Sequence, residues 1–295
     1  MLMKVDKVYQ KLIEDVKVEG EKYADDAMVS IYIEQRQAMD EIHALIGKEY
    51  IAHSKDGLMV LTSAQQQRLN KSMKAKLKAM GLKLGESEVK QVSVLLAEVF
   101  SATYYRNAFI LESGLKANLK FNMLKKEFIA SAIKAKYKGE FFSNRIWSNK
   151  ASMIDHLQSS LIDAHSGKLT IDKVGRDIRD RFNVTAYESQ RLVTTENARV
   201  QSQASYEIGK SAGVEQVMWS ATLDMKTNPE DASYDGRVWS IDDTSKPESP
   251  LHPNCRCLYI NIPYEGWSPT QRKNNESGKV IAYTNYEDWA KDKGI

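Results

Sequence analysis

The chain has 295 residues, of which 42% are hydrophobic and 27% charged, and its formal net charge is +3. This composition is ordinary for a soluble globular protein of about two domains. No apolar run approaches the ~18 residues that a membrane span requires, so no membrane partner is predicted. The N-terminus lacks the layout of a secretory signal, and we expect the protein to be kept in a reducing cytoplasm.

The charge is distributed unevenly along the chain. Residues 61–150 carry 17 Lys/Arg against 6 Asp/Glu, a net charge of +11, whereas the segments before and after each have a net charge of −4. A basic middle between two acidic ends is expected when one face of a protein meets a polyanion.

Helical periodicity dominates the first half. Apolar residues recur every three or four positions over residues 1–50 and again from about residue 63. Gly47 and Gly81 follow these stretches and predict helix ends. The longest periodic stretch, residues 87–138, is expected to be two helices that meet near 113–115.

Lysines are concentrated on these helices. The simpler interpretation is a solvated helical face. The alternative is contact with the DNA backbone, which the shortage of acids in residues 61–150 favours. The candidate DNA-binding residues are Lys71, Lys74, Lys76, Lys78, Lys116, Lys120, Lys125, Lys126, Lys134, Lys136 and Lys138.

The character of the chain changes near Gly139, where we place a domain boundary. Helical patterns continue to about Lys210, and alternating patterns then predict short strands. The predicted fold class is α+β: a mainly α-helical N-terminal half, then a helical segment and a small antiparallel β-unit. The expected helices are about 150–164, 170–182 and 185–210, and the expected strands are near 220–223, 237–239 and 258–262. The expected domains are 1–140 (basic from about 61), 141–265, and a polar tail, 266–295, with a final short helix near 286–291.

The turn His252–Cys257 holds one of five histidines and both cysteines. Pro253 stiffens it by restricting one φ angle. The cysteines are separated by one residue, which is poor geometry for a mutual disulfide. They are therefore expected to be free thiols, metal ligands or small buried apolar groups.

Several landmarks occur in a characteristic order. Arg145-Ile146-Trp147 comes first, followed by Thr195-Glu196 with Arg199 on a long predicted helix. Val217-Met218-Trp219-Ser220-Ala221, Leu223-Asp224, Asp235-Gly236-Arg237-Val238 and Pro250-Leu251-His252-Pro253-Asn254-Cys255-Arg256-Cys257 complete the series. With these landmarks the chain, over roughly 141–262, resembles the phage Mu F-protein-like family of minor head morphogenesis proteins. The first 140 residues resemble more loosely the helical N-terminal half of such proteins.

The resemblance implies a structural protein of a tailed phage or prophage, associated with the portal protein in the head interior. It also implies DNA binding without strong sequence preference, and a role in head assembly or genome delivery. Capsid or scaffolding proteins are implied as further partners, and the host cytoplasm as the location during assembly.

A metal site is a separate hypothesis. Many relatives carry a Cys-x-x-Cys upstream of the turn, but here those positions are Asn228 and Asp231. The remaining candidate ligands are Asp231, His252, Cys255 and Cys257, a set that suits Zn²⁺. Without metal, His252 would hydrogen-bond the loop and the cysteines would be buried in the small sheet core.

Three functions follow from these observations. The first is a DNA-associated minor head protein that is not an enzyme. The second is a metal-dependent nuclease or toxin-like transferase, against which the missing general base counts. The third is a portal-docking module whose lysines only solvate helices. On the long helix, Glu196 and Arg199 are three residues apart and are expected to form a structural pair.

Overall fold

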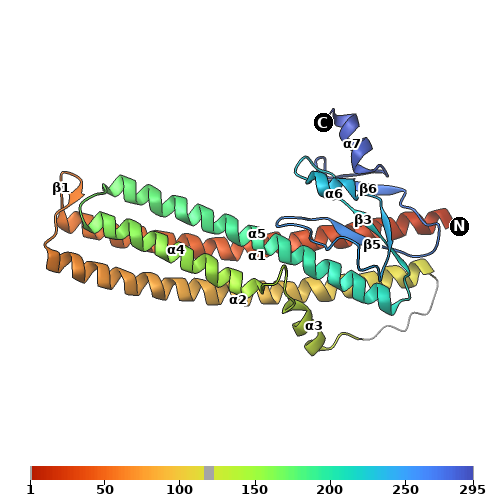
Figure 1. Ribbon diagram of the computed structural model, residues 1–295, viewed down its shortest axis with the longest axis horizontal. Coiled ribbons are helices and arrows are strands. Elements are labelled where there is room, and N and C mark those ends of the chain that lie inside the picture. Colours follow the sequence, from red (N-terminus) through yellow and green to blue (C-terminus); the bar gives the residue numbers. More distant parts are fainter. Residues whose placement is uncertain (1, 116–122, 295) are drawn as a thin grey trace. The chain divides into compact units, whose positions relative to one another are not determined.

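The computed structural model describes residues 2–115 and 123–294 (Figure 1). The chain is mainly helical with small antiparallel sheets, which confirms the predicted α+β class. Among the described helices, none combines the length and apolarity needed to cross a membrane. The helices are α1 (Leu2–His53), α2 (Ser63–Leu115), α3 (Lys126–Ile133), α4 (Phe142–His165), α5 (Ile171–Ser211), α6 (Pro229–Ser233) and α7 (Tyr286–Lys293). The strands are β1 (Ser54–Lys55), β2 (Leu58–Met59), β3 (Gln216–Ser220), β4 (Val238–Ser240), β5 (Leu258–Ile262), β6 (Gln271–Asn274) and β7 (Lys279–Ala282).

Two compact units alternate along the chain. One unit contains residues 1–25, 94–137 and 193–295, and the other contains residues 26–93 and 138–192. We call them the sheet unit and the helical unit. Each of the long helices α1, α2 and α5 contributes to both units, so this grouping differs from a sequential division at 140 and 265.

The helical unit consists of four helical segments. The β1–β2 hairpin joins α1 to α2, and a short turn joins α4 to α5, so consecutive segments run antiparallel (Figure 1). Their apolar faces form one core that includes Ile42, Leu77, Leu157 and Ile178. Such a pattern of apolar stripes facing one another is the usual basis of a helix bundle.

Two sets of buried polar groups in the helical unit lie close to partners of suitable charge or hydrogen-bonding character. Lys150 Nζ lies 2.5 Å from Glu88 Oε2, and both side chains are almost completely buried. His165 is fully buried, and its ring nitrogens lie 2.6 Å from Glu49 Oε2 and 2.6 Å from Asn70 Oδ1. Buried charges need such partners because burial removes their hydration.

The predicted helix ends at Gly47 and Gly81 are wrong, because α1 and α2 continue through both residues. At Gly47 the neighbouring Ile46 and Tyr50 are 2% exposed, and their packing outweighs the ~1 kcal/mol by which glycine disfavours a helix. At Gly81 a Cβ would lie 2.7 Å from the Ile154 side chain. This glycine therefore permits close helix packing and does not end the helix.

Other boundaries also differ. The two helices expected over 170–182 and 185–210 are a single helix, α5, whose buried residues continue without interruption through Thr185 and Ser189. The helix expected over 150–164 begins eight residues earlier, at Phe142. The tail contains the β6–β7 pair in addition to the expected final helix. The strand expected at 258–262 is confirmed as β5.

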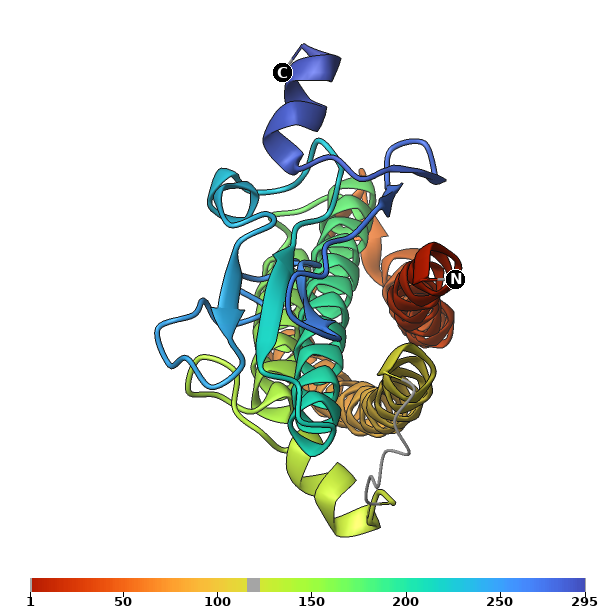
Figure 2. The ribbon, with the colours of Figure 1, turned by 90° about the vertical axis from the view of Figure 1, so that its right-hand side faces the viewer.

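In the sheet unit, β3 is the central strand of a three-stranded antiparallel sheet with the order β4-β3-β5. Met218 is paired with Ile260, and Trp219 is paired with Tyr259. Because side chains alternate along a strand, Met218 joins one apolar cluster with Ile110 while Trp219 joins another on the opposite face. The sheet lies beside the C-terminal half of α5 (Figure 2), where Asn261 Nδ2 donates a hydrogen bond to the Ser205 carbonyl at 3.0 Å.

Candidate functional site

The His252–Cys257 turn lies directly before β5 and is attached to α5. The backbone N–H of Asn254 donates to Thr195 Oγ1 at 3.0 Å, and Cys255 N–H donates to the His252 carbonyl at 3.1 Å. Asn254 has a φ of 66°, a left-handed conformation that asparagine tolerates better than most residues. The threonine of the Thr195-Glu196 landmark thus holds the turn in place.

Asp231 is brought to this turn by α6. The side chain of Asn228 accepts a hydrogen bond from Glu230 N–H at 2.9 Å, and Pro229 occupies the first helical turn. Both features favour a helix start at this position. The Asp231 carbonyl then accepts a hydrogen bond from Trp219 Nε1 at 3.1 Å, which fixes α6 against the sheet.

Asp231, His252 and Cys255 form a buried cluster, which we call the Asp231 cluster. Asp231 Oδ2 lies 2.6 Å from His252 Nε2, and Asp231 Oδ1 accepts a hydrogen bond from the Cys255 thiol at 3.5 Å. The other ring nitrogen of His252 lies 2.9 Å from the Pro253 carbonyl. Both partners of the ring are acceptors, an arrangement that matches the two N–H donors of a protonated imidazole.

The cluster changes the acidity of two of its members. Burial by itself would lower the pKa of His252, but hydrogen bonds to the Pro253 carbonyl and the Asp231 carboxylate raise that pKa above its ordinary value. A hydrogen bond with the Cys257 side chain lowers the pKa of Cys255 to about 7, although burial opposes this shift. The surroundings therefore favour protonation of His252 and make Cys255 a stronger acid than an ordinary thiol.

The donor set fits a transition metal. One oxygen of Asp231, one nitrogen of His252 and the sulfur of Cys255 all lie within 4.8 Å of one another. Oxygen, imidazole and thiolate donors suit Zn²⁺, and three protein ligands are enough to hold it. Cys257 is buried next to Cys255 but is not among these three donors. Asn228 caps α6 and does not belong to the set.

The geometry does not resemble an activated cysteine nucleophile. Cys255 is 2% exposed, and its thiol is directed at Asp231. The imidazole of His252 is bonded to Asp231 and to the Pro253 carbonyl, so it does not act as a base toward the sulfur.

Glu196 and Arg199 form the pair expected from their spacing. Arg199 Nε donates to Glu196 Oε2 at 2.6 Å, and both side chains are buried. The guanidinium also donates to the carbonyls of Ala132 at 3.0 Å and Ile133 at 3.2 Å, at the C-terminal end of α3. Sequence reasoning identified the pair but not its attachment to α3, because nothing local connects residues 66 positions apart.

The candidate DNA-binding lysines are divided between the two units. Lys71, Lys74, Lys76 and Lys78 are exposed on α2 in the helical unit, and Lys138 belongs to the same unit. Lys125, Lys126, Lys134 and Lys136 are exposed in the sheet unit, near α3. Lys116 and Lys120 lie outside the described residues. Lys71, Lys74 and Lys78 share one face of α2, because they are three and four residues apart; we call them the lysine stripe.

Comparison with known proteins identifies part of the chain. Residues 155–260 match the family described as Phage Mu protein F like protein. This segment is similar to that family, and we call it the Mu F-like region. It runs from α4 through α5 and the central sheet to β5, so it contains Thr195, Glu196, Arg199 and the whole Asp231 cluster. The predicted resemblance to this family is confirmed.

Two relatives extend the similarity beyond the Mu F-like region. The chain is 23% identical to the Minor head protein GP7 of Bacillus phage SPP1, over 96% of this chain and 96% of that protein. It is 24% identical to the NAD(+)--arginine ADP-ribosyltransferase EFV of Enterococcus faecalis (strain ATCC 700802 / V583), over 97% of this chain but only 60% of the relative. No solved structure matches the chain.

Proposed function

We propose that this protein is a minor head protein of a tailed phage or prophage and has no catalytic activity of its own. The observation that carries the proposal is the Mu F-like region within a chain that aligns with a minor head protein over 96% of both lengths. The proposed location is the interior of the virion head, with the host cytoplasm as the site of assembly. The proposed protein partners are the portal protein and capsid or scaffolding proteins.

The transferase relative supports an enzymatic alternative less well. The chain spans about 60% of that protein, and the similarity does not cover the rest of the relative. The segment shared with the transferase is the same segment that aligns with a head protein almost from end to end. We therefore assign the shared segment to the head-protein role, and the buried thiol of Cys255 agrees with a structural role for the Asp231 cluster.

We propose further that the lysine stripe contacts the phosphate backbone of double-stranded DNA. Residues 63–85 contain six Lys/Arg and no Asp or Glu. Lys71, Lys74 and Lys78 are exposed, and within the described residues none of them forms an ion pair. A lysine-rich helix of this kind neutralises phosphates without reading bases, so the expected binding is independent of sequence.

The head-protein proposal is tested by locating the protein in purified virions. Separated heads and tails, analysed by mass spectrometry, should contain the chain in the head fraction together with the portal protein. Recovery in tails only, or absence from virions, would refute the proposal. Retention on immobilised portal protein at high salt after DNase treatment, combined with no DNA binding, would favour the portal-docking alternative.

The DNA proposal is tested by fluorescence anisotropy with two unrelated duplexes. Both should bind with similar affinity, and the affinity should fall steeply from 50 to 200 mM salt. Replacing Lys71, Lys74 and Lys78 with Ala should weaken both complexes equally and lower the slope of log K against log salt by about 2–3, since each phosphate contact contributes ~0.9. The control variant, with Lys48 and Lys55 replaced by Ala, should behave like the wild type. An affinity that hardly changes with salt would overturn the proposal.

A further inference from the structure

Possible metal ligands meet at one place in the part of the chain that the structure describes, the Asp231 cluster. A carboxylate oxygen of Asp231, a ring nitrogen of His252 and the sulfur of Cys255 all lie within 4.8 Å of one another. Ligand atoms around a tetrahedral Zn²⁺ are roughly 3.2–3.8 Å apart, since each lies about 2.0–2.3 Å from the metal. The 3.5 Å between Cys255 Sγ and Asp231 Oδ1 already has this length. An ion fits among the three atoms once the 2.6 Å contact between Asp231 and His252 widens by less than about 1 Å.

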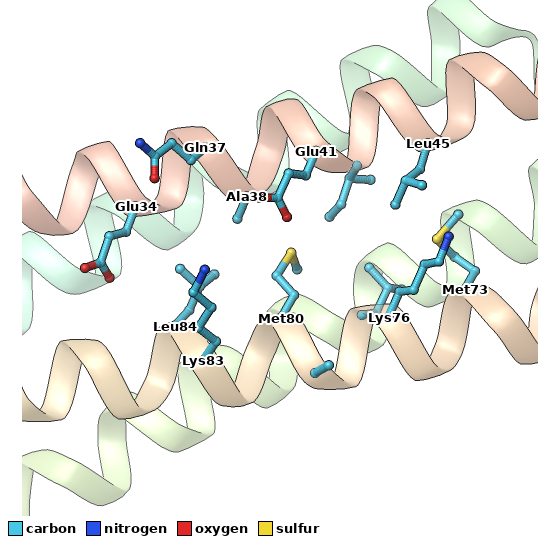
Figure 3. Close-up of a pocket in the computed structure, with 13 residues that line it drawn as sticks. Glu34, Gln37, Ala38, Glu41, Leu45, Met73, Lys76, Met80, Lys83 and Leu84 are labelled. Atoms are coloured by element: carbon cyan, nitrogen blue, oxygen red, sulfur yellow. The ribbon is translucent and has the colours of Figure 1, made fainter.

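The space between α1 and α2 is a hollow of a different kind. Figure 3 shows Ala38 and Leu45 extending from α1 toward Met73 and Leu84 of α2. Met73 is 2% exposed and Leu84 is 5% exposed, and both belong to the core of the helical unit. Because these apolar side chains already pack in that core, little apolar surface is left for a ligand. The Asp231 cluster differs, because its polar side chains are directed at one another.

Two separate segments hold the ligands in place without help from a metal. Helix α6 carries Asp231, and the carbonyl of that residue fixes the helix to the central strand β3. The turn that carries His252 and Cys255 is attached to α5, because Asn254 N–H donates to Thr195 Oγ1. Ligands that are positioned before binding reduce the free energy lost to ordering the chain when the ion binds.

The imidazole of His252 is oriented as a metal ligand usually is. Its Nδ1 lies 2.9 Å from the Pro253 carbonyl, and its Nε2 is directed at Asp231. Metal-binding histidines commonly donate their second N–H to a carbonyl or carboxylate, which fixes the ring and strengthens the other nitrogen as a ligand. The contact with the Pro253 carbonyl therefore leaves Nε2 as the nitrogen that would bind the ion.

Cys257 can complete the set, although it lies outside the group of three. Its side chain forms a hydrogen bond with that of Cys255, and both cysteines are buried. Arg256, which lies between them, pairs with Asp224 instead. One carboxylate, one imidazole and two thiolates give the four ligands of a closed tetrahedral site, the kind that Zn²⁺ occupies in a structural role. Thiolate ligands also disfavour Mg²⁺ and Ca²⁺, which prefer oxygen.

We propose that one Zn²⁺ ion joins α6 to the turn before β5, with four ligands: Asp231, His252, Cys255 and Cys257. The ion has a structural role, because it links two segments that are otherwise joined by hydrogen bonds. In a closed site the protein occupies all four positions, so no metal-bound water is available for hydrolysis. The proposal concerns the folding of the sheet unit and does not depend on the head-protein role.

The stoichiometry and the affinity are measured on the purified full chain. After loading with Zn²⁺ and desalting, mass spectrometry of the metal content should find one ion per chain. His252→Gln should weaken binding at least about 100-fold in competition with a chromophoric chelator, since even residues that only hydrogen-bond a metal ligand contribute about 10–100-fold. The control His156→Gln changes an exposed histidine of α4 and should bind zinc like the wild type. Failure of the wild type to retain zinc, or equal affinity of the two variants, would overturn the proposal.

Cobalt substitution identifies the ligands in the wild-type chain, even if a variant fails to fold. Co²⁺ in the site should give the visible bands of tetrahedral coordination and a thiolate-to-cobalt charge-transfer band in the near ultraviolet. Cys257→Ser should about halve the charge-transfer intensity per bound ion, because one of two thiolates is lost. Weak bands of octahedral coordination without charge transfer would indicate an adventitious ion only and would overturn the proposal. An unchanged intensity in Cys257→Ser would overturn the set of four ligands.

Hydrogen exchange tests the structural role of the ion. With zinc bound, peptides that cover α6 and the turn before β5 should exchange more slowly than after chelation, whereas peptides of α4 in the helical unit should not change. In His252→Gln, zinc should not affect these peptides. Equal protection of the wild type with and without zinc would refute the role of the ion in joining the two segments. These measurements use the isolated chain, so their outcome is independent of the virion test.

Discussion

Replacing Arg199 with Met should strongly destabilise the attachment of α3 to α5. Glu196 is completely buried and Arg199 is 8% exposed, so the substitution removes the guanidinium that Arg199 places against a buried carboxylate. Breaking a buried ion pair from one side costs about 3–5 kcal/mol. The carbonyls of Ala132 and Ile133 also lose their guanidinium donors, which adds to the cost.

Hydrogen exchange measured by mass spectrometry is the suitable assay, because it reports local opening in a chain with two units. Peptides from α3 should exchange much faster in Arg199→Met than in the wild type. The double variant with Glu196→Met should recover at least half of the lost free energy, since the buried carboxylate is then gone as well. As a control, Arg179→Met removes an exposed pair with Asp180 and should cost at most about 0.5 kcal/mol. A cost below about 1 kcal/mol for Arg199→Met, or a double variant as unstable as the single one, would refute this account.

Four further predictions concern the Asp231 cluster and the helix glycines. Asp231→Asn should lower the free energy of urea unfolding by about 1.5–3 kcal/mol, the range for hydrogen bonds to charged groups. The control Glu230→Gln changes an exposed neighbour and should have little effect. Equal stability of both variants would contradict the assigned contacts. Since the folded-state pKa of His252 is raised, its contribution is complete below the unfolded pKa of about 6.5 and is lost as pH rises through the folded pKa. The difference in unfolding free energy between wild type and His252→Gln should therefore shrink between pH 6 and pH 9, and a difference that grows would reverse the argument. If the cluster holds Zn²⁺, added Zn²⁺ should raise the melting temperature more at pH 8 than at pH 6, because the metal competes with the proton, and should not do so in His252→Gln. Gly85→Ala should destabilise the helical unit because its added Cβ would overlap an aromatic ring. Gly47→Ala should stabilise the unit by about 0.5–1 kcal/mol, because no atom lies within 4 Å of the added Cβ. Equal melting temperatures of the two variants would contradict both expectations.

Much of the candidate site was predictable because its members are close in the sequence or carry distinctive chemistry. The His252–Cys257 turn places three ligand-type residues within six positions, and the strand after it has a clear apolar pattern. Glu196 and Arg199 were predictable as a pair because three residues along a helix bring side chains together. Asp231 entered only through the resemblance to the Mu F-like family, and in the structure its carboxylate lies 2.6 Å from His252.

Helix ends were less predictable because glycine has two roles. A glycine at a helix end relieves strain at a positive φ angle, whereas a glycine inside a helix allows a neighbouring helix to approach. The residues around Gly47 and Gly81 form the same kind of pattern that is found where a helix ends. Whether Ile154 of α4 lies against α2 is a long-range property, so the role of Gly81 could only be decided by the packing.

The fold class, the basic segment 61–150 and the turn before β5 could be predicted from periodicity, composition and spacing, which are local properties of the chain. The Mu F-like region was predicted from the resemblance of its landmark residues to a known family. The tertiary structure alone decided that Thr195 holds the turn and that Arg199 holds the end of α3. The physical reason is that each of these assignments depends on contacts between side chains that are distant in the sequence. Those contacts are set by the packing of whole helices.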